Sequence, residues 1–203
     1  MYFHIKRVHE AKIPFDIYLE AGNDWTHFRH LHRKSHALFQ LLHKSGGREI
    51  FLYKTRVIYP FPIYNTFIVF REPAPEQAGY KQLYINIKNG RRHFLSSKNE
   101  QLEDRVRGTT EFWFDVPAYW RLAPKLFFRL ALGRMKAVAD EDDVMMRERM
   151  EHGAYSRPAC APDVPPLFDL YHDLMEKGLP KAEHSFSASF FVDTETREQH
   201  RTA

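Results

Sequence analysis

The chain has 203 residues, of which 43% are hydrophobic and 28% charged, and its formal net charge is +4. These values are typical of one globular domain with a hydrophobic core, and the mild charge argues against a nucleic-acid partner. The single cysteine, Cys160, excludes an internal disulfide framework, and the first 15 residues lack the apolar segment of a signal peptide. We therefore expect a cytoplasmic protein.

The chain after residue 14 is predicted to begin with a strand and a helix. Residues 15–22 are expected to form a strand that ends in a glycine turn. Asn23 or Asp24 is a suitable cap for a helix over the stretch that follows, which is rich in histidine.

Several antiparallel strands are predicted next. The clearest signal is strict alternation, in which Leu83 and Ile85 share one face and Tyr84 shares the other. An Asn-Gly pair at 89–90 then predicts a hairpin turn. The strand-forming segments are residues 46–62, 63–70, 82–88, 91–97 and 109–117.

The second half changes from strand to helix periodicity. Residues 124–152 are predicted to form one long helix that stops at Gly153. A proline-rich joint, a short amphipathic helix, a further strand and a polar tail follow. We therefore divide the chain into a domain over residues 1–155 and a C-terminal extension over residues 156–203.

This order of elements predicts an α+β fold in which a curved antiparallel sheet wraps around the long C-terminal helix. Such a sheet has one apolar face to cover, and the space beneath the helix is a common place for a small apolar ligand. The order resembles the helix-grip fold of the START-related (SRPBCC) superfamily of lipid-binding and polyketide-cyclase-like domains. Rings expected to line the pocket are those of Phe67, Tyr84, Phe112 and Phe114.

Four histidines lie within residues 23–36. His27 and His32 are five positions apart, so a regular helix would hold them about 140° apart, and only a π-bulge or a break would bring them together. His32 with His36, and His27 with His30, converge without distortion. Geometry alone therefore leaves the choice of a metal-binding pair open, and a face of ordinary surface histidines is the alternative.

Asp24, His27 and His32 form a D-x2-H-x4-H pattern. It is similar to the motif of the catalytic domain of Rieske-type non-haem iron oxygenases, which has a START-like fold. The resemblance implies that His27 and His32 bind Fe(II) and that Asp24 acts in catalysis by orienting a ligand and linking the iron to an electron donor. It also implies a third ligand on the long helix, placed at Asp142, with the alternatives Asp140 and Asp143.

The chain departs from these oxygenases in one important respect. Their [2Fe–2S] cluster is held by two cysteines and two histidines, and one cysteine cannot build it. An oxygenase of this kind would therefore take its electrons from a separate electron-transfer protein.

Three functions remain open. The first is an iron-dependent oxygenase acting on a small apolar or aromatic substrate. The second is a metal-free START-like ligand-binding or polyketide-cyclase-like protein, in which Tyr84, His93 or Arg56 polarises a carbonyl group. The third is a zinc hydrolase, because two histidines, one aspartate and an open water position also suit Zn²⁺.

Residues 121–136 are both basic and apolar at helical spacing. Such a helix can lie on an anionic membrane surface, although packing of its apolar face against the sheet is the expected arrangement.

Overall fold

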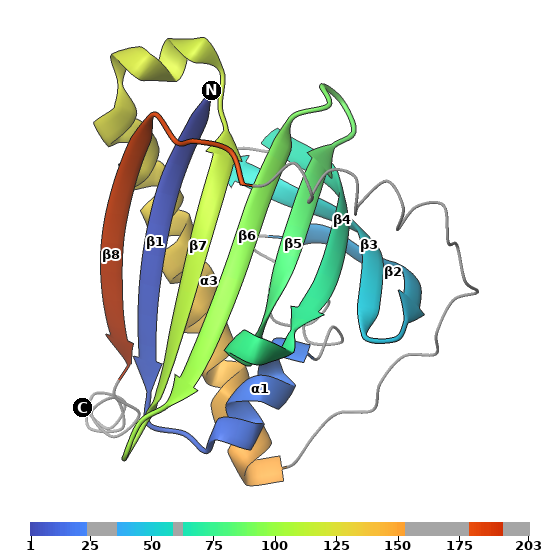
Figure 1. Cartoon of the computed structure of the whole chain (residues 1–203), viewed down its shortest axis with the longest axis vertical. Coiled ribbons are helices and arrows are strands. Elements are labelled where there is room, and N and C mark those ends of the chain that lie inside the picture. The colour runs from blue at the N-terminus through green and yellow to red at the C-terminus, as the bar shows by residue number, and fades with distance from the viewer. Residues whose placement is uncertain (24–35, 59–62, 153–178, 193–203) are drawn as a thin grey trace.

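The computed structural model describes residues 1–23, 36–58, 63–152 and 179–192. Within them, one eight-stranded sheet has the order β2-β3-β4-β5-β6-β7-β1-β8 (Figure 1). Neighbouring strands are antiparallel except β1 and β8, which are parallel. The strands are β1 (Tyr2–Ala11), β2 (His36–Ser45), β3 (Arg48–Ile58), β4 (Ile63–Ala74), β5 (Gly79–Asn86), β6 (Arg92–Gln101), β7 (Val106–Asp115) and β8 (His184–Val192).

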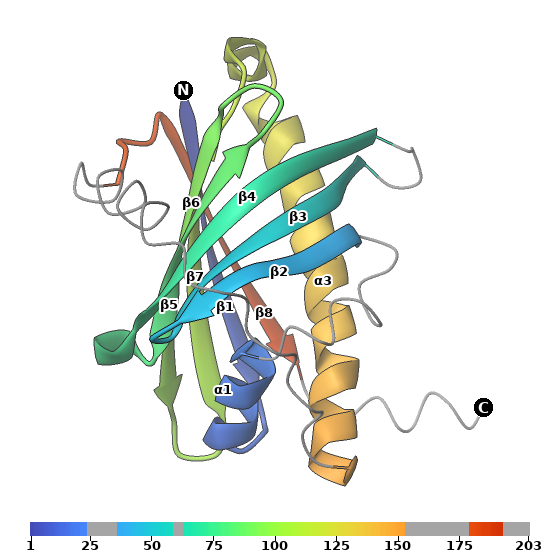
Figure 2. The same cartoon turned by 90° about the vertical axis from the view of Figure 1, so that its right-hand side faces the viewer.

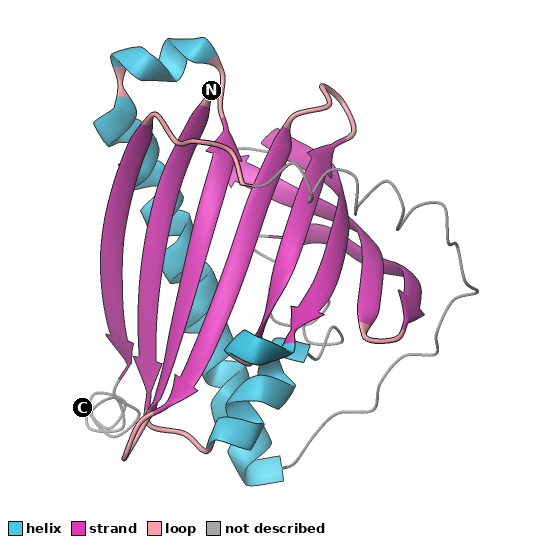
Figure 3. Cartoon of the chain, in the orientation of Figure 1, coloured by secondary structure: helices cyan, strands magenta, loops and turns pink. Residues whose placement is uncertain are grey.

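Both described α-helices lie on the same side of the sheet. β2, β3 and β4 bend around the long helix α3, so the sheet is concave toward it (Figure 2). Figure 3 shows this division between a layer of strands and the helices. The helices are α1 (Phe15–Asn23), α3 (Pro124–His152) and the short 3-10 helices η1 (Pro75–Gln77) and η2 (Ala118–Leu122). No helix in the described ranges contains an apolar stretch long enough to cross a bilayer.

Much of the predicted element order is confirmed, but the assignment of residues 15–22 as a strand is wrong. They form α1, whose first turn is closed by a 3.1 Å hydrogen bond from the Tyr18 amide to the Pro14 carbonyl. Tyr18 and Ala21 are three positions apart and therefore share one helix face, which packs against Ile13 and Met146. This packing against α3 outweighs the local pattern that suggested a strand.

The sequence did not predict where β1 and β2 lie in the sheet. β1 lies between β7 and the edge strand β8, and β2 forms the opposite edge. β8 lies in the predicted C-terminal extension, yet it pairs with β1 from Phe3 opposite His184 to Ala11 opposite Val192. The strand predicted near the C-terminus is therefore part of the same sheet.

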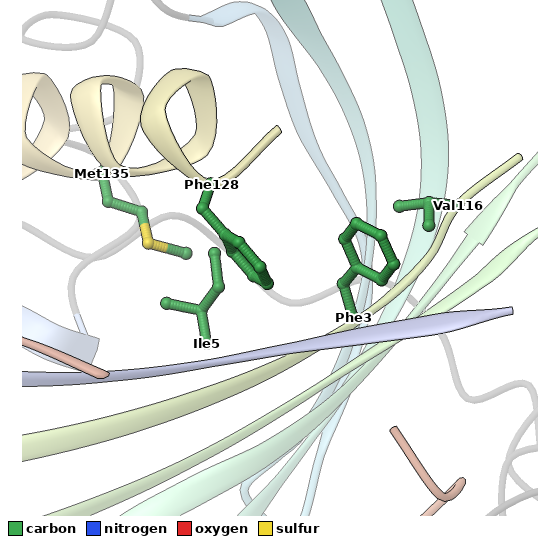
Figure 4. Packing of buried hydrophobic residues seen from close by; sticks show 5 residues of the cluster. All are labelled: Phe3, Ile5, Val116, Phe128 and Met135. Carbon is green, nitrogen blue, oxygen red and sulfur yellow. The ribbon is translucent and has the colours of Figure 1, made fainter. Parts of the chain in front are cut away.

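The main core lies between the sheet and the first half of α3. Figure 4 shows Phe3 and Ile5 of β1 pointing toward Phe128 and Met135 of α3, with Val116 beside Phe3. All five side chains are buried. The strand contributes residues two apart and the helix residues seven apart, so each element presents one continuous apolar face to the other.

The opposite face of the sheet, here called the outer face, carries a second core cluster. Leu83 and Ile85 belong to it, together with Ile50, Phe70 and Phe94. The predicted alternation along β5 is thus confirmed, since Tyr84 belongs to a separate cluster on the face toward α3, here called the inner face. The predicted hairpin turn is also present, with Gly90 at a φ of 68° that favours glycine.

Candidate ligand-binding site on the inner face

The inner face is defined by cross-strand register. Tyr53 of β3 lies opposite Phe67 of β4, and Val69 lies opposite Tyr84 of β5. Tyr84 in turn lies opposite His93 of β6, which lies opposite Phe114 of β7. Because directly opposed residues project to the same side of a sheet, these side chains form a continuous row facing α3.

Aromatic rings dominate the part of the inner face that is formed by strands β2 to β5. Phe39, Phe51, Phe67 and Val69 are buried, and Tyr53 and Tyr84 pack against them. The rings meet edge-on, with 6.0 Å between the centroids of Phe67 and Tyr84 and 6.2 Å between those of Tyr53 and Tyr84. This arrangement is favourable for aromatic pairs and suits contact with a further planar molecule.

Polar groups from β3 and α3 meet beside these rings. Arg134 of α3 donates a hydrogen bond from Nη2 to the hydroxyl of Thr55. Burial raises the pKa of the Tyr53 phenol, while the Arg134 charge and a hydrogen bond with Thr55 oppose that rise. The Tyr53 phenol is therefore protonated at neutral pH and lies next to a guanidinium group.

Tyr84 provides a second buried phenol. Its hydroxyl donates a 2.5 Å hydrogen bond to Oε1 of Gln82, which lies two residues away on the same face of β5. Burial, followed by the neighbouring phenols of Tyr53 and Tyr80, raises the pKa of Tyr84 well above its ordinary value. The inner face thus carries two protonated phenols and a guanidinium group among apolar rings.

Asp142 lies on the side of α3 that faces the sheet. It is three positions after Ala139 and four before Met146, both of which are buried. Its negative charge also contributes to the raised pKa of Tyr53. In contrast, both carboxylate oxygens of Asp140 bind the ammonium group of Lys136 at 2.8 Å in an exposed pair.

His93 connects the two aromatic clusters of the inner face. Its ring centroid is 5.4 Å from that of Phe67 and 5.8 Å from that of Phe114. Burial lowers its pKa to about 4, against a partial opposing effect of Asp115. The Asp115 amide donates a 3.1 Å hydrogen bond to Nδ1, so the proton of the neutral ring resides on Nε2.

We expect acid to destabilise the protein through His93. Its folded-state pKa of about 4 lies below the ordinary 6.5, so its contribution is fully present above pH 6.5 and is lost as the pH falls toward 4. The loss approaches about 3 kcal/mol. Urea unfolding between pH 7 and 4 would measure it, and His93→Gln should flatten this part of the profile. An NMR titration midpoint of His93 near 6.5 would contradict the expectation.

A buried ion-pair network supports the end of the inner face near α1. Arg71 Nη1 donates to Glu49 Oε2 at 3.0 Å, and Lys44 Nζ donates to Glu49 Oε1 at 2.6 Å. Arg71 Nη2 also donates to the Gly22 carbonyl at 2.9 Å, and its guanidinium lies 3.9 Å from the Tyr80 ring centroid. Arg71 therefore fixes the end of α1 to three strands of the sheet.

Of the four residues predicted for catalysis and metal binding, the structure describes only Asp142. Asp24, His27 and His32 lie outside the described residues, and Asp142 faces the sheet. No group of three or more histidine, cysteine, aspartate or glutamate side chains in the described ranges is placed to hold a metal. The Fe(II) site and the zinc alternative therefore stay predictions.

The four predicted pocket rings all face α3, but in two groups. Phe67 and Tyr84 belong to the aromatic cluster under β2 to β5. Phe112 and Phe114 stack at 5.7 Å and pack into the core beneath the first half of α3. Of the three residues proposed to polarise a carbonyl group, Arg56 does not face α3. It lies on the outer face, where its Nη2 donates a 3.0 Å hydrogen bond to the Tyr64 hydroxyl.

Sequence reasoning did not select Tyr53, Thr55 or Arg134. The alternation of Glu49, Phe51, Tyr53 and Thr55 along β3 is a usable signal, because every second residue faces α3. Arg134 gives a weaker signal, since a lone arginine within an amphipathic helix usually points to solvent.

Comparisons with known proteins support the fold. No family model and no curated protein matches the sequence. Among solved structures, Zhui aromatase/cyclase from Streptomyces sp. R1128 matches with a TM-score of 0.62 and 11% identity, covering 77% of this chain and 100% of that chain. A protein from Thermus thermophilus matches with a TM-score of 0.58 and 9% identity, covering 70% of this chain and 96% of that chain.

Norcoclaurine synthase from Thalictrum flavum, in complex with dopamine and hydroxybenzaldehyde, matches with a TM-score of 0.53 and 14% identity. The match covers 76% of this chain and 90% of that chain. At these identities the likeness concerns the fold alone. The chain has the α+β, START-like helix-grip fold, with its sheet wrapped around α3.

Proposed function

We propose that this chain is a metal-free, polyketide-cyclase-like protein that binds a small aromatic ligand between the inner face of the sheet and α3. The observation that carries the proposal is the placement of Tyr53 and Arg134 beside a wall of aromatic rings. Rings supply contact area for a planar molecule, and the few polar groups among them fix its orientation. A ligand with a carbonyl or phenolic oxygen matches this combination.

The charges on the inner face suit chemistry next to a carbonyl group. The Arg134 guanidinium and the Tyr53 hydroxyl are donors that stabilise negative charge on an enolate oxygen. Asp142 is a carboxylate on the same side of α3, and it accepts the proton removed from the adjacent carbon. The enolate carbon then attacks a second carbonyl of the same ligand, and the C=O π bond of that carbonyl breaks to give an alkoxide. The alkoxide takes the proton back from Asp142, so the step forms a carbon–carbon bond and closes a ring that carries a hydroxyl group.

The solved neighbours agree with this class of ligand. One is an aromatase/cyclase, and another holds dopamine and hydroxybenzaldehyde, both of which carry aromatic rings and phenolic oxygens. These ligands belong to those proteins. Their relevance here is that the same fold holds aromatic molecules of this size.

Binding of anilinonaphthalene sulfonate, an aromatic anion that fluoresces in apolar surroundings, tests the proposal. We expect the protein to bind it and Arg134→Gln to weaken binding about tenfold or more, because one charged hydrogen bond is lost. Arg56→Gln is the matched control, since Arg56 lies on the outer face and contacts Tyr64. Equal affinity of Arg134→Gln and the parent protein, or an equal loss in the control, would refute the assignment.

The placement of Asp142 also favours a second candidate, the iron-dependent oxygenase. A half-buried carboxylate that faces the sheet fits the third ligand of a site with two histidines and one carboxylate, for which His27 and His32 are the proposed partners. Bound Fe(II) would supply oxygen activation. Asp142 would hold the ion, and Asp24 would orient a ligand histidine.

Metal analysis of protein purified without oxygen separates the two candidates. The cyclase-like function predicts no stoichiometric iron or zinc in the parent protein or in His27→Ala. The oxygenase predicts one iron per chain, and its loss in both His27→Ala and Asp142→Ala. Stoichiometric zinc with the same dependence on these residues would instead favour the hydrolase.

A further inference from the structure

One side of η2 and early α3 carries apolar side chains that do not enter the core. Phe128 and Met135 pack toward the sheet, whereas Leu122, Leu126 and Leu130 are 90%, 50% and 42% exposed. These leucines are four positions apart, so Leu126 and Leu130 lie above one another on the outward side of the helix. The segment therefore packs one apolar face against the sheet and exposes a second row of apolar side chains to solvent.

Basic residues lie directly beside this apolar row. Lys125 and Arg129 are exposed and four positions apart, and no ion pair involving either occurs in the described part of the chain. The sequence from residue 116 to residue 139 contains no acidic residue at all. A lysine in the first turn faces the positive end of the helix dipole, so this placement does not favour the helix itself.

The location of the row makes it accessible. η2 and the first turn of α3 lie beyond the end of the sheet at which β7 ends and β1 begins (Figure 1). Tyr119, just before the row, is also largely exposed. Leucine and tyrosine side chains flanked by lysine and arginine are the composition of surfaces that rest in the interface of a bilayer.

We propose that the row of Leu122, Leu126 and Leu130, with Lys125 and Arg129, binds an anionic membrane surface. The leucines enter the boundary between headgroups and acyl chains. The long stems of the two basic residues lie alongside, with their charges at the lipid phosphates and carboxylates. This inference is independent of the function proposed for the inner face.

Co-sedimentation with vesicles tests the proposal. We expect the full chain to bind vesicles of phosphatidylcholine with about one third phosphatidylserine, and to bind pure phosphatidylcholine far less, with binding that falls as salt rises. Lys125→Glu/Arg129→Glu should weaken binding about tenfold or more. This variant should fold, because glutamate is favourable near the N-terminus of a helix. Leu126→Gln/Leu130→Gln should weaken binding as well.

Lys81→Glu/Lys98→Glu is the matched control, since it changes the net charge equally on β5 and β6, where the side chains of Lys81 and Lys98 are 44% and 58% exposed. It should retain vesicle binding. The proposal is overturned if the parent protein does not sediment with anionic vesicles, or if the control loses as much binding as Lys125→Glu/Arg129→Glu. It is also overturned if the leucine variant leaves vesicle binding intact and instead converts a dimer into a monomer, which would assign the row to a second copy of the chain.

Discussion

Replacing Phe3 by alanine is expected to lower the free energy of unfolding by about 3–5 kcal/mol. Phe3 is 0% exposed, and its ring lies 5.1 Å from that of Phe127, 5.4 Å from that of Phe128 and 4.9 Å from that of His184, centroid to centroid. The substitution removes these contacts at once and leaves a cavity among β1, α3 and β8. Urea denaturation at equilibrium, with the slope of the transition compared between variants, would measure the loss.

Tyr119→Ala is the control for this measurement. The Tyr119 side chain is largely exposed, so its removal should change the free energy of unfolding by about 0.5 kcal/mol or less. A similarly small loss for Phe3→Ala would mean that β1 is not packed against α3 as described.

Arg71→Ala is expected to cost about 3 kcal/mol, because it removes one of the two cationic side chains that bind the buried Glu49 carboxylate and leaves Lys44 in place. The side chains of Arg71 and Glu49 are only 5% and 4% exposed. The change also removes the hydrogen bond to the Gly22 carbonyl, so the end of α1 should loosen. Urea denaturation measures the first effect, and amide hydrogen exchange in α1 measures the second.

Two further variants make the interpretation specific. Arg71→Met/Glu49→Leu replaces the buried pair by apolar side chains of similar size and should recover most of the lost stability. Lys98→Ala removes one member of an exposed pair with Glu100 and should cost less than about 1 kcal/mol. If the double variant is no more stable than Arg71→Ala, the loss does not arise from the buried Glu49 carboxylate losing the Arg71 charge.

Much of the fold was predictable because its signals are local. The alternation in β5, the prolines that separate β3 from β4, and the long helical period of α3 each follow from neighbouring residues. The assignment of residues 15–22 failed because eight residues carry too little periodic signal, and contact with Met146 of α3 decides their structure. The partners of β1 were likewise out of reach, since β7 and β8 both lie in the second half of the chain.

The candidate site was only partly predictable for a related reason. Tyr84 was recognised on a strand with clear alternation and His93 on the strand after the predicted hairpin turn. Arg56 was expected in the cavity, although it projects to the outer face. Thr55 and Arg134 meet only because β3 curves over α3, and no local pattern reports that curvature. Asp142 was singled out by the resemblance to iron oxygenases, and its role is still a prediction.

The parallel pairing of β1 with β8 has a consequence for the order of folding. β1 leaves the ribosome well before its neighbours β7 and β8, which lie much later in the chain. Until they arrive, both hydrogen-bonding edges of β1 are open, and a free strand edge is prone to pair with another chain. We therefore expect slow folding for a chain of this length and a dependence on chaperones during synthesis, set by the distance between the partners along the chain.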